Sequence, residues 1–137
     1  MSQRTNIATL RAFADAWNPG EPDWSSENLE RVDAELEIDS PLSALSGKPY
    51  RGIDGARKWL SDIDDQFDVW EGRDYEFRPV GDDRLLVFNS IHARGRESGV
   101  ELDWRIGMLA DFRDGRLLRL KIFRDRAEAL EAVGLEE

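Results

Sequence analysis

Cysteine is absent from this chain of 137 residues, so neither disulfides nor thiolate metal sites can form, and we expect no metal and no other cofactor. Long apolar runs are missing too. No segment approaches the roughly 18 apolar residues that span a bilayer, and the first residues lack the apolar stretch of a secretion signal. These absences favour a cytoplasmic protein without a membrane partner.

Positive charge is also scarce. The chain has 19 Lys and Arg residues against 29 Asp and Glu residues, which gives a net charge of −10. A nucleic-acid-binding protein needs a basic face for the phosphates, so nucleic acid is not an expected partner. There is a single histidine, His92, and therefore only one side chain whose ordinary pKa lies near neutrality.

Strict alternation of apolar residues is the strongest pattern present. It runs through residues 100–112 and predicts a strand with one buried face. Gly107 and Leu109 are exceptions on the other, mostly charged face. The sequence Arg113-Asp114-Gly115 then predicts a tight hairpin, and residues 116–124 a returning strand. The alternating apolar residues are Leu102, Trp104, Ile106, Met108, Ala110 and Phe112.

Helical spacing of apolar residues dominates the first half. It predicts helices over residues 5–17 and 25–34, a short strand over 36–40, a loop over 41–52, and a long third helix that starts near residues 53–55. Strands follow over residues 69–79 and 84–94. A last helix opens at Asp125, a predicted cap, and ends before Gly134. Helices followed by an antiparallel meander indicate an α+β fold, with a curved sheet wrapped around the third helix.

Four motifs in this order resemble the SnoaL-like branch of the nuclear transport factor 2 (NTF2)-like superfamily. They are residues 50–55 (YRGIDG), 94–100 (RGRESGV), 112–116 (FRDGR) and 125–135 (DRAEALEAVGL). The resemblance implies one domain, residues 1–137, shaped as an NTF2-like or cystatin-like cone with an apolar pocket. It also implies a homodimer formed through the sheet. The superfamily includes isomerases, polyketide cyclases, hydrolases and non-catalytic binding modules, so the fold does not fix the chemistry.

The catalytic sets known in this superfamily are not matched. The positions that the resemblance assigns to ketosteroid isomerase chemistry hold Ser40, Met108 and Phe13, which supply no suitable base or strong donor. The positions of the epoxide-hydrolase set, which activates a water, hold only apolar residues. They are Ala93, Ile91 and Ile122.

Other residues are candidates to contact a ligand. Asn89 is a polar group on an otherwise apolar strand face, although a core amide bonded to backbone is the simpler interpretation. Arg124 either receives an anion or pairs with an acid. We expect Trp17, Trp59 and Trp104 to belong to the core more than to a ligand platform. The full set of candidates is Trp17, Ser40, Tyr50, Trp59, Asn89, Trp104, Met108 and Arg124.

Several residues are expected outside the pocket. His92 alternates with Asn89 and Ile91, which puts it on the opposite face of the sheet. Asp39 should also face outward, unless the register slips by one residue and turns it inward as a base. Four acids crowd the end of the third helix and are interpreted as a solvated face, because their spacing does not match a calcium loop. They are Asp62, Asp64, Asp65 and Asp68.

Two function classes remain open. The first is a module that binds a small, largely hydrophobic ligand in the pocket, which the unmatched catalytic positions favour. The second is a small cofactor-independent enzyme, an isomerase, cyclase or hydrolase, that uses a set such as Asn89, Asp39 and Tyr50. A purely structural dimerisation domain would instead fill the pocket with its own tryptophans.

Overall fold

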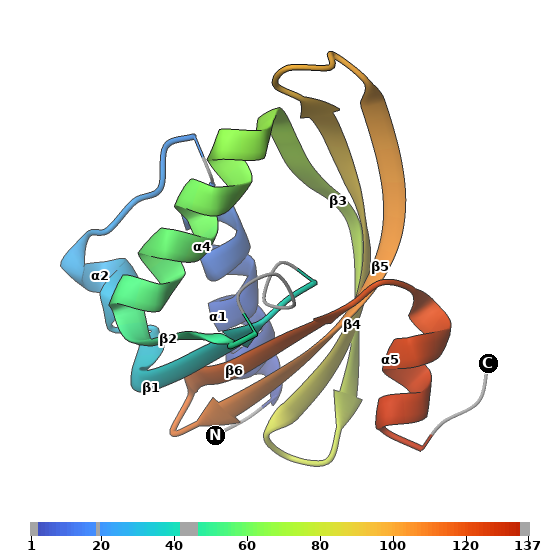
Figure 1. The fold of residues 1–137 in the computed structure, drawn as a ribbon. Coiled ribbons are helices and arrows are strands. Elements are labelled where there is room, and N and C mark those ends of the chain that lie inside the picture. Colours follow the sequence, from blue (N-terminus) through green and yellow to red (C-terminus); the bar gives the residue numbers. More distant parts are fainter. Residues whose placement is uncertain (1–2, 19, 42–46, 135–137) are drawn as a thin grey trace.

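The computed structural model describes residues 3–18, 20–41 and 47–134. Its elements follow one another along the chain as drawn in Figure 1. They are α1 (Gln3–Ala16), α2 (Ser26–Leu29), β1 (Val32–Asp39), β2 (Tyr50–Arg51), α4 (Gly52–Gln66), β3 (Phe67–Val80), β4 (Arg84–Gly95), β5 (Glu101–Arg113), β6 (Arg116–Phe123) and α5 (Arg126–Ala132).

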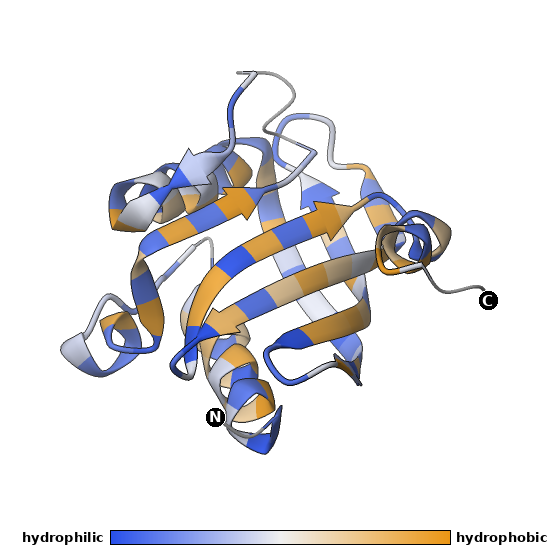
Figure 2. Ribbon diagram, turned by 90° about the horizontal axis from the view of Figure 1, so that it is seen from below, coloured by the Kyte–Doolittle hydropathy of each residue, from blue (hydrophilic) through white to orange (hydrophobic). Residues whose placement is uncertain are grey.

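The sheet has six strands in the order β2-β1-β6-β5-β4-β3. Strands β3 to β6 form the predicted antiparallel meander, and β1 pairs with β6 in parallel. The sheet curves, with α1 and α4 on its concave side and α5 on the other side (Figure 1). Hydrophobic and hydrophilic residues alternate along several strands, as one-sided burial requires (Figure 2). The predicted α+β fold with a curved sheet is confirmed.

The β5–β6 hairpin has the predicted turn. Asp114 and Gly115 both adopt positive φ angles, 55° and 77°, which a two-residue turn matched to the strand twist requires. The register places Met108 opposite Ile122 and Ala110 opposite Leu120. The inward faces of both strands are therefore apolar at the same level of the sheet.

The helix predicted over residues 25–34 is wrong. Helix α2 ends at Leu29, and β1 already begins at Val32. Val32 pairs with Leu117 of β6, but a register shift separates this pair from the pair of Glu37 with Arg119. That irregularity interrupts the alternation of buried and exposed residues along β1. Leu29 and Val32 therefore fall at helical spacing, although one ends a helix and the other begins a strand. Of the predicted loop, residues 42–46 lie outside the described part, and residues 50–51 form β2.

A second apolar cluster lies on the outer face of the sheet, under α5. Gly107 and Leu109 break the polar pattern because this helix covers them: a Cβ atom at Gly107 would lie 2.5 Å from the Cβ of Ala129. The helix is capped as predicted, since the Asp125 carboxylate accepts from the Glu128 backbone N–H at 2.9 Å. The cluster comprises Leu86, Phe88, Leu109, Phe123, Ala129 and Leu130.

The acids at the end of α4 are more than a solvated face. Asp68, which lies at the start of β3 just after the helix, forms a two-bond ion pair with Arg94, at 2.9 and 3.1 Å. Arg96 donates to the backbone oxygen of Asp64 at 2.7 and 2.9 Å, which satisfies a terminal carbonyl of the helix. The β4–β5 hairpin is thus bound to the end of α4. Within the described part of the chain, no helix is long and apolar enough to cross a membrane.

Candidate functional site

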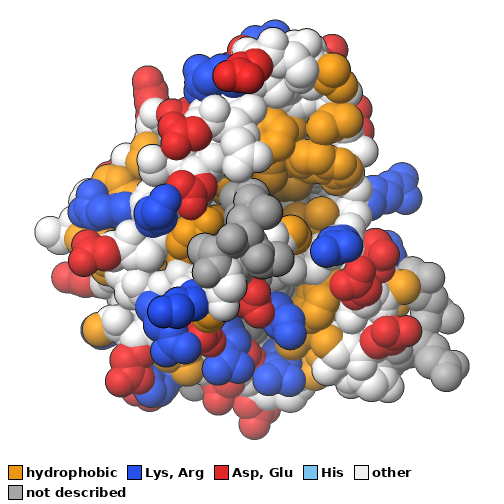
Figure 3. All heavy atoms as spheres, viewed as in Figure 1, with side chains coloured by type: hydrophobic (Ala, Val, Ile, Leu, Met, Phe, Trp, Pro, Cys, Tyr) orange, Lys and Arg blue, Asp and Glu red, His pale blue; other side chains and the backbone are white. Residues whose placement is uncertain are grey.

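A cavity of about 750 Å³ lies between the concave face of the sheet and helices α1 and α4. Its lining comes from both helices and from strands β3, β4, β5 and β6. Hydrophobic side chains gather near the top of the view in Figure 3, between α4 and the upper ends of β3, β4 and β5. The tryptophans leave this space open, which disfavours a purely structural domain with a filled pocket.

Aromatic rings form two walls of the cavity. On the side of β3 and β5, Phe67, Trp70 and Trp104 contact one another, with ring centroids 5.1 to 6.0 Å apart. On the side of α1, Phe13 and Trp17 have centroids 4.3 Å apart. Such contacts fix the rings in place at the wall of the cavity.

Asn89 contributes a buried amide to the lining. The residue is 5% exposed, and its Nδ2 donates to the backbone oxygen of Ser90 at 3.3 Å. Its Oδ1 is buried and has no hydrogen-bond partner among the described residues. Exchanging the two amide atoms would bring two acceptors together at Ser90, so the orientation with an unpaired oxygen is the favoured one.

Tyr75, which the sequence analysis did not identify, enters the same cavity through a bulge in β3. Arg73 pairs with Ser90 and Glu76 with Phe88, so two residues of β3, Asp74 and Tyr75, stand against Asn89 alone. Asp74 takes the left-handed conformation, with φ of 57°. The bulge reverses the faces of the strand beyond it and turns the Tyr75 ring inward.

The ring of Tyr75 lies along the inner face of its own strand. Its hydroxyl lies over Gly72, where an added Cβ atom would be 2.0 Å from that oxygen. Burial, and secondarily the nearby Asp15 carboxylate, raise the pKa of Tyr75, so the hydroxyl keeps its proton at neutral pH. A glycine inside a predicted strand is the one sequence signal that pointed to this arrangement.

No protein-family model matches the chain, and no curated protein matches it either. Solved structures do. A protein described as a SnoaL-like polyketide cyclase from Jannaschia sp. CCS1 aligns with a TM-score of 0.73 and 17% identity, over 98% of this chain and 94% of that one. TerC, crystallised with polyporic acid, aligns with a TM-score of 0.73 and 18% identity, over 94% of this chain and 98% of that one. For an NTF2-like protein of unknown function from Burkholderia pseudomallei the TM-score is 0.71 and the identity 16%, over 98% of this chain and 99% of that one. The chain has the NTF2-like fold. At these identities the likeness concerns the fold alone.

Within this NTF2-like cone, seven of the eight candidate residues line the cavity: Trp17, Ser40, Trp59, Asn89, Trp104, Met108 and Arg124. Tyr50 does not. Its hydroxyl donates to Asp62 at 2.7 Å, and burial together with this bond raises the pKa of Tyr50 to about 12. The tyrosine therefore anchors β2 to α4. Trp17 and Trp59, 5% and 8% exposed, belong to the core and to the lining at once.

Two residues expected outside the cavity do lie outside it. His92 is on the outer face of the sheet, with Nδ1 3.0 Å from Oδ1 of Asp103. Asp39 is not among the described residues of the lining, so the register has not slipped. The set of Asn89, Asp39 and Tyr50 is consequently not assembled in one place.

The resemblance assigns six residues to the catalytic positions of ketosteroid isomerase and epoxide hydrolase, and most of them line the cavity of the NTF2-like cone. Five of the six residues line it, and Ala93 is buried. Their side chains are apolar except for one hydroxyl, that of Ser40. The five are Phe13, Ser40, Ile91, Met108 and Ile122.

Proposed function

We propose that this protein binds a small, largely hydrophobic ligand in the cavity of its cone. The observation that carries the proposal is the open, aromatic-walled cavity of about 750 Å³. Ligand sites are typically concave, mostly apolar spaces of about 300–1,000 Å³ with a few polar groups. Water in such a space would face tryptophan rings, and its displacement by an apolar molecule is favourable.

The alternative is a cofactor-independent enzyme, as the polyketide cyclases with this fold suggest. Such an enzyme needs an acid or base tuned to neutral pH, which burial usually provides. Among the described residues, four carboxylates have a shifted pKa; all four are shifted downward, and each receives a bond from a charged side chain. Glu71, which contributes to the lining, is the fourth of them and is paired with Arg73 at 2.7 Å. Binding without turnover is therefore favoured.

The binding test compares one cavity-filling variant with a matched control. Ile106 lines the cavity, whereas its neighbour Arg105 is exposed on the other face of β5. Naphthalene serves as the probe, and calorimetry measures its dissociation constant. We expect Ile106→Trp to weaken binding by about tenfold or more, because the added indole occupies the space. Arg105→Trp should bind as the wild type does. No binding by the wild type, or equal binding by both variants, would refute the proposal.

We further propose that the protein is a homodimer assembled through the sheet and acts in the cytoplasm. Native mass spectrometry of the purified protein reports the subunit count and any retained small molecule together. A dimer carrying a discrete adduct would support both binding and assembly, and the adduct mass would define the ligand class. A monomer would contradict the assembly. Cell fractionation checks the location.

A further inference from the structure

The inward row of β6 leads from the floor of the cavity to its opening. Leu120, Ile122 and Arg124, which lies just past the end of the strand, occupy alternate positions, and all three line the cavity. Leu120 is 2% exposed, Ile122 is partly buried and Arg124 is exposed. A charged side chain therefore stands at the rim of the cavity, in line with an apolar floor.

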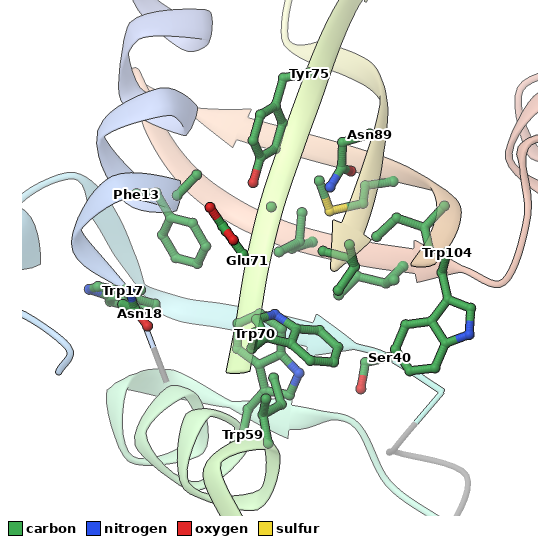
Figure 4. A pocket seen from close by; sticks show the side chains of 18 of the residues that line it. Phe13, Trp17, Asn18, Ser40, Trp59, Trp70, Glu71, Tyr75, Asn89 and Trp104 are labelled. Carbon is green, nitrogen blue, oxygen red and sulfur yellow. The ribbon is translucent and has the colours of Figure 1, made fainter. Parts of the chain in front are cut away.

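This rim also includes Ser40 and Trp104. β1 runs parallel to β6, and Ser40, just past the end of β1, lies beside the inward row of β6. β5 runs antiparallel to β6 and brings Trp104 toward the end of β6 at which Arg124 lies. Figure 4 shows Ser40 and Trp104 on one side of the cavity, with Phe13 and Glu71 toward α1 on the other.

In the described lining, only Arg124 has a charge that no neighbouring residue offsets. The lining holds four charged residues. Glu71 forms an ion pair with Arg73 at 2.7 Å, and Arg11 and Asp15 carry opposite charges one helical turn apart on α1. Arg124 forms no ion pair with any described residue.

The acids close to Arg124 in the chain and in the sheet are directed elsewhere. Asp125 follows it directly, but the Asp125 carboxylate accepts from the Glu128 backbone N–H at 2.9 Å and so caps α5. Asp39 pairs in register with Lys121, and neither residue lines the cavity. The guanidinium is therefore available to an anion from outside the described chain. At an exposed position such an ion pair requires little desolvation.

We propose that Arg124 binds the carboxylate of a largely apolar acid whose body fills the cavity. A guanidinium presents its N–H groups as a planar fork that matches the two oxygens of a carboxylate. This inference rests on the proposed binding function. It specifies the ligand as an amphipathic anion, bound with its charge at the rim and its apolar part against the aromatic walls.

The charges of the lining also set the direction in which this ligand lies. Asp15 and Glu71 would repel a carboxylate placed toward α1. Glu71 is on β3, three strands from β6, and a spacing of about 4.8 Å per strand puts it roughly 14 Å from the rim. At that distance salt screens its repulsion of an anion held by Arg124.

The test uses three matched probes at neutral pH: 2-naphthoate, 2-naphthamide and naphthalene. The first two have nearly the same shape, but only 2-naphthoate is charged. We expect wild-type protein to bind 2-naphthoate about fivefold more tightly than 2-naphthamide, which is typical of an ion pair in contact with solvent. Calorimetry gives the three dissociation constants. The preference should shrink as salt is raised from about 0.05 M to about 0.5 M.

Three variants assign the preference to its residue. Arg124→Gln should remove the preference and leave naphthalene affinity within about twofold. Arg124→Lys should retain part of it, because an ammonium group keeps the charge and loses the planar fork. Arg105→Gln removes the same charge from the exposed outer face of β5 and should retain the preference in full. Because both arginines are exposed, these variants should fold as the wild type does, which thermal melting checks.

The outcomes separate the two proposals. A wild type that binds naphthalene but prefers 2-naphthoate over 2-naphthamide by less than twofold would overturn the anion site and leave the binding function standing. Equal losses of preference in Arg124→Gln and Arg105→Gln would also overturn it, because the effect would then come from net charge. Failure of all three probes to bind would refute the binding function, and this inference with it.

Discussion

Asp33 offers a sharp test of the energetics, because one arginine binds both it and an exposed carboxylate. Arg113 donates to both oxygens of Asp33, at 2.8 and 3.0 Å. The backbone N–H of Glu35 donates to the same carboxylate at 2.8 Å. Arg113 also reaches the Glu35 side chain at 3.0 Å. Asp33 is 9% exposed, whereas the Glu35 side chain is 74% exposed.

We predict that Asp33→Asn lowers the free energy of unfolding by about 1–3 kcal/mol. The substitution replaces a carboxylate oxygen with an NH₂ group that faces the guanidinium, so one charge-assisted bond is lost outright. Such bonds contribute about 1.5–3 kcal/mol each, but the Arg113 side chain is 48% exposed, and water screens part of this. Glu35→Gln should cost less than about 0.5 kcal/mol.

Urea denaturation of the wild type and the two variants at neutral pH measures these differences in unfolding free energy. The comparison requires that the three unfolding free energies depend on urea concentration with the same slope. The pH dependence supplies an independent check. Hydrogen bonding by Arg113, and then by the Glu35 backbone N–H, lowers the pKa of Asp33 in the folded state. Its contribution is therefore complete above the unfolded pKa of about 3.9 and is lost as the pH falls through the folded pKa.

The wild type and Asp33→Asn should accordingly differ by a constant amount from pH 7 to about 5 and converge in acid. A cost below 0.5 kcal/mol for the Asp33 variant, on the order of experimental error, would refute the reasoning. An equal cost for Glu35→Gln would do the same. So would a difference that persists below the folded pKa.

Three further substitutions test the placement of single residues. Met108→Asp should lower stability by about 2–4 kcal/mol, because a carboxylate would enter an apolar cavity; unchanged thermal melting would mean that water solvates this part of the wall. His92→Ala should leave naphthalene affinity within about twofold, and a tenfold loss in calorimetry would place the imidazole in the site. Gly107→Ala should cost about 1–3 kcal/mol, since the new methyl group meets Ala129 at 2.5 Å; Gly20→Ala, with nothing within 4 Å, is the control and should be close to neutral in the same urea titrations.

The meander was predictable from the sequence because the concave faces of its strands are apolar, whereas only part of the outer face is covered, by α5. Burial on one side imposes a period of two, which no helix reproduces, and Asp114-Gly115 fixed the register of the last hairpin. The same logic placed Met108 inward and His92 outward. These residues lie where strict alternation holds, so counting along the strand was enough.

Bulges account for most of what could not be predicted. Trp70 and Gly72 face inward, and strict alternation from them would turn Tyr75 and Phe77 outward. The extra residue at Asp74 reverses this, and the inward position of Tyr75 depends on it. A similar irregularity hid the start of β1 at Val32.

Contacts distant in sequence account for the rest. Tyr50 was a cavity candidate because it precedes a long helix, and only the fold shows that Asp62 accepts from its hydroxyl. Leu109 was an exception to the alternation until α5 was seen to cover it. In both cases the partner lies more than ten residues away, beyond the reach of local periodicity.

The kink in β3 has a consequence for solubility as well as for recognition. β3 is an edge strand of 14 residues, long enough for another chain to pair with its free backbone groups. The bulge at Asp74 and Tyr75 interrupts that row of donors and acceptors, and Pro79 removes one donor further along. A variant that straightened the strand would therefore displace the phenol from the cavity and expose a continuous template for aggregation in the same step.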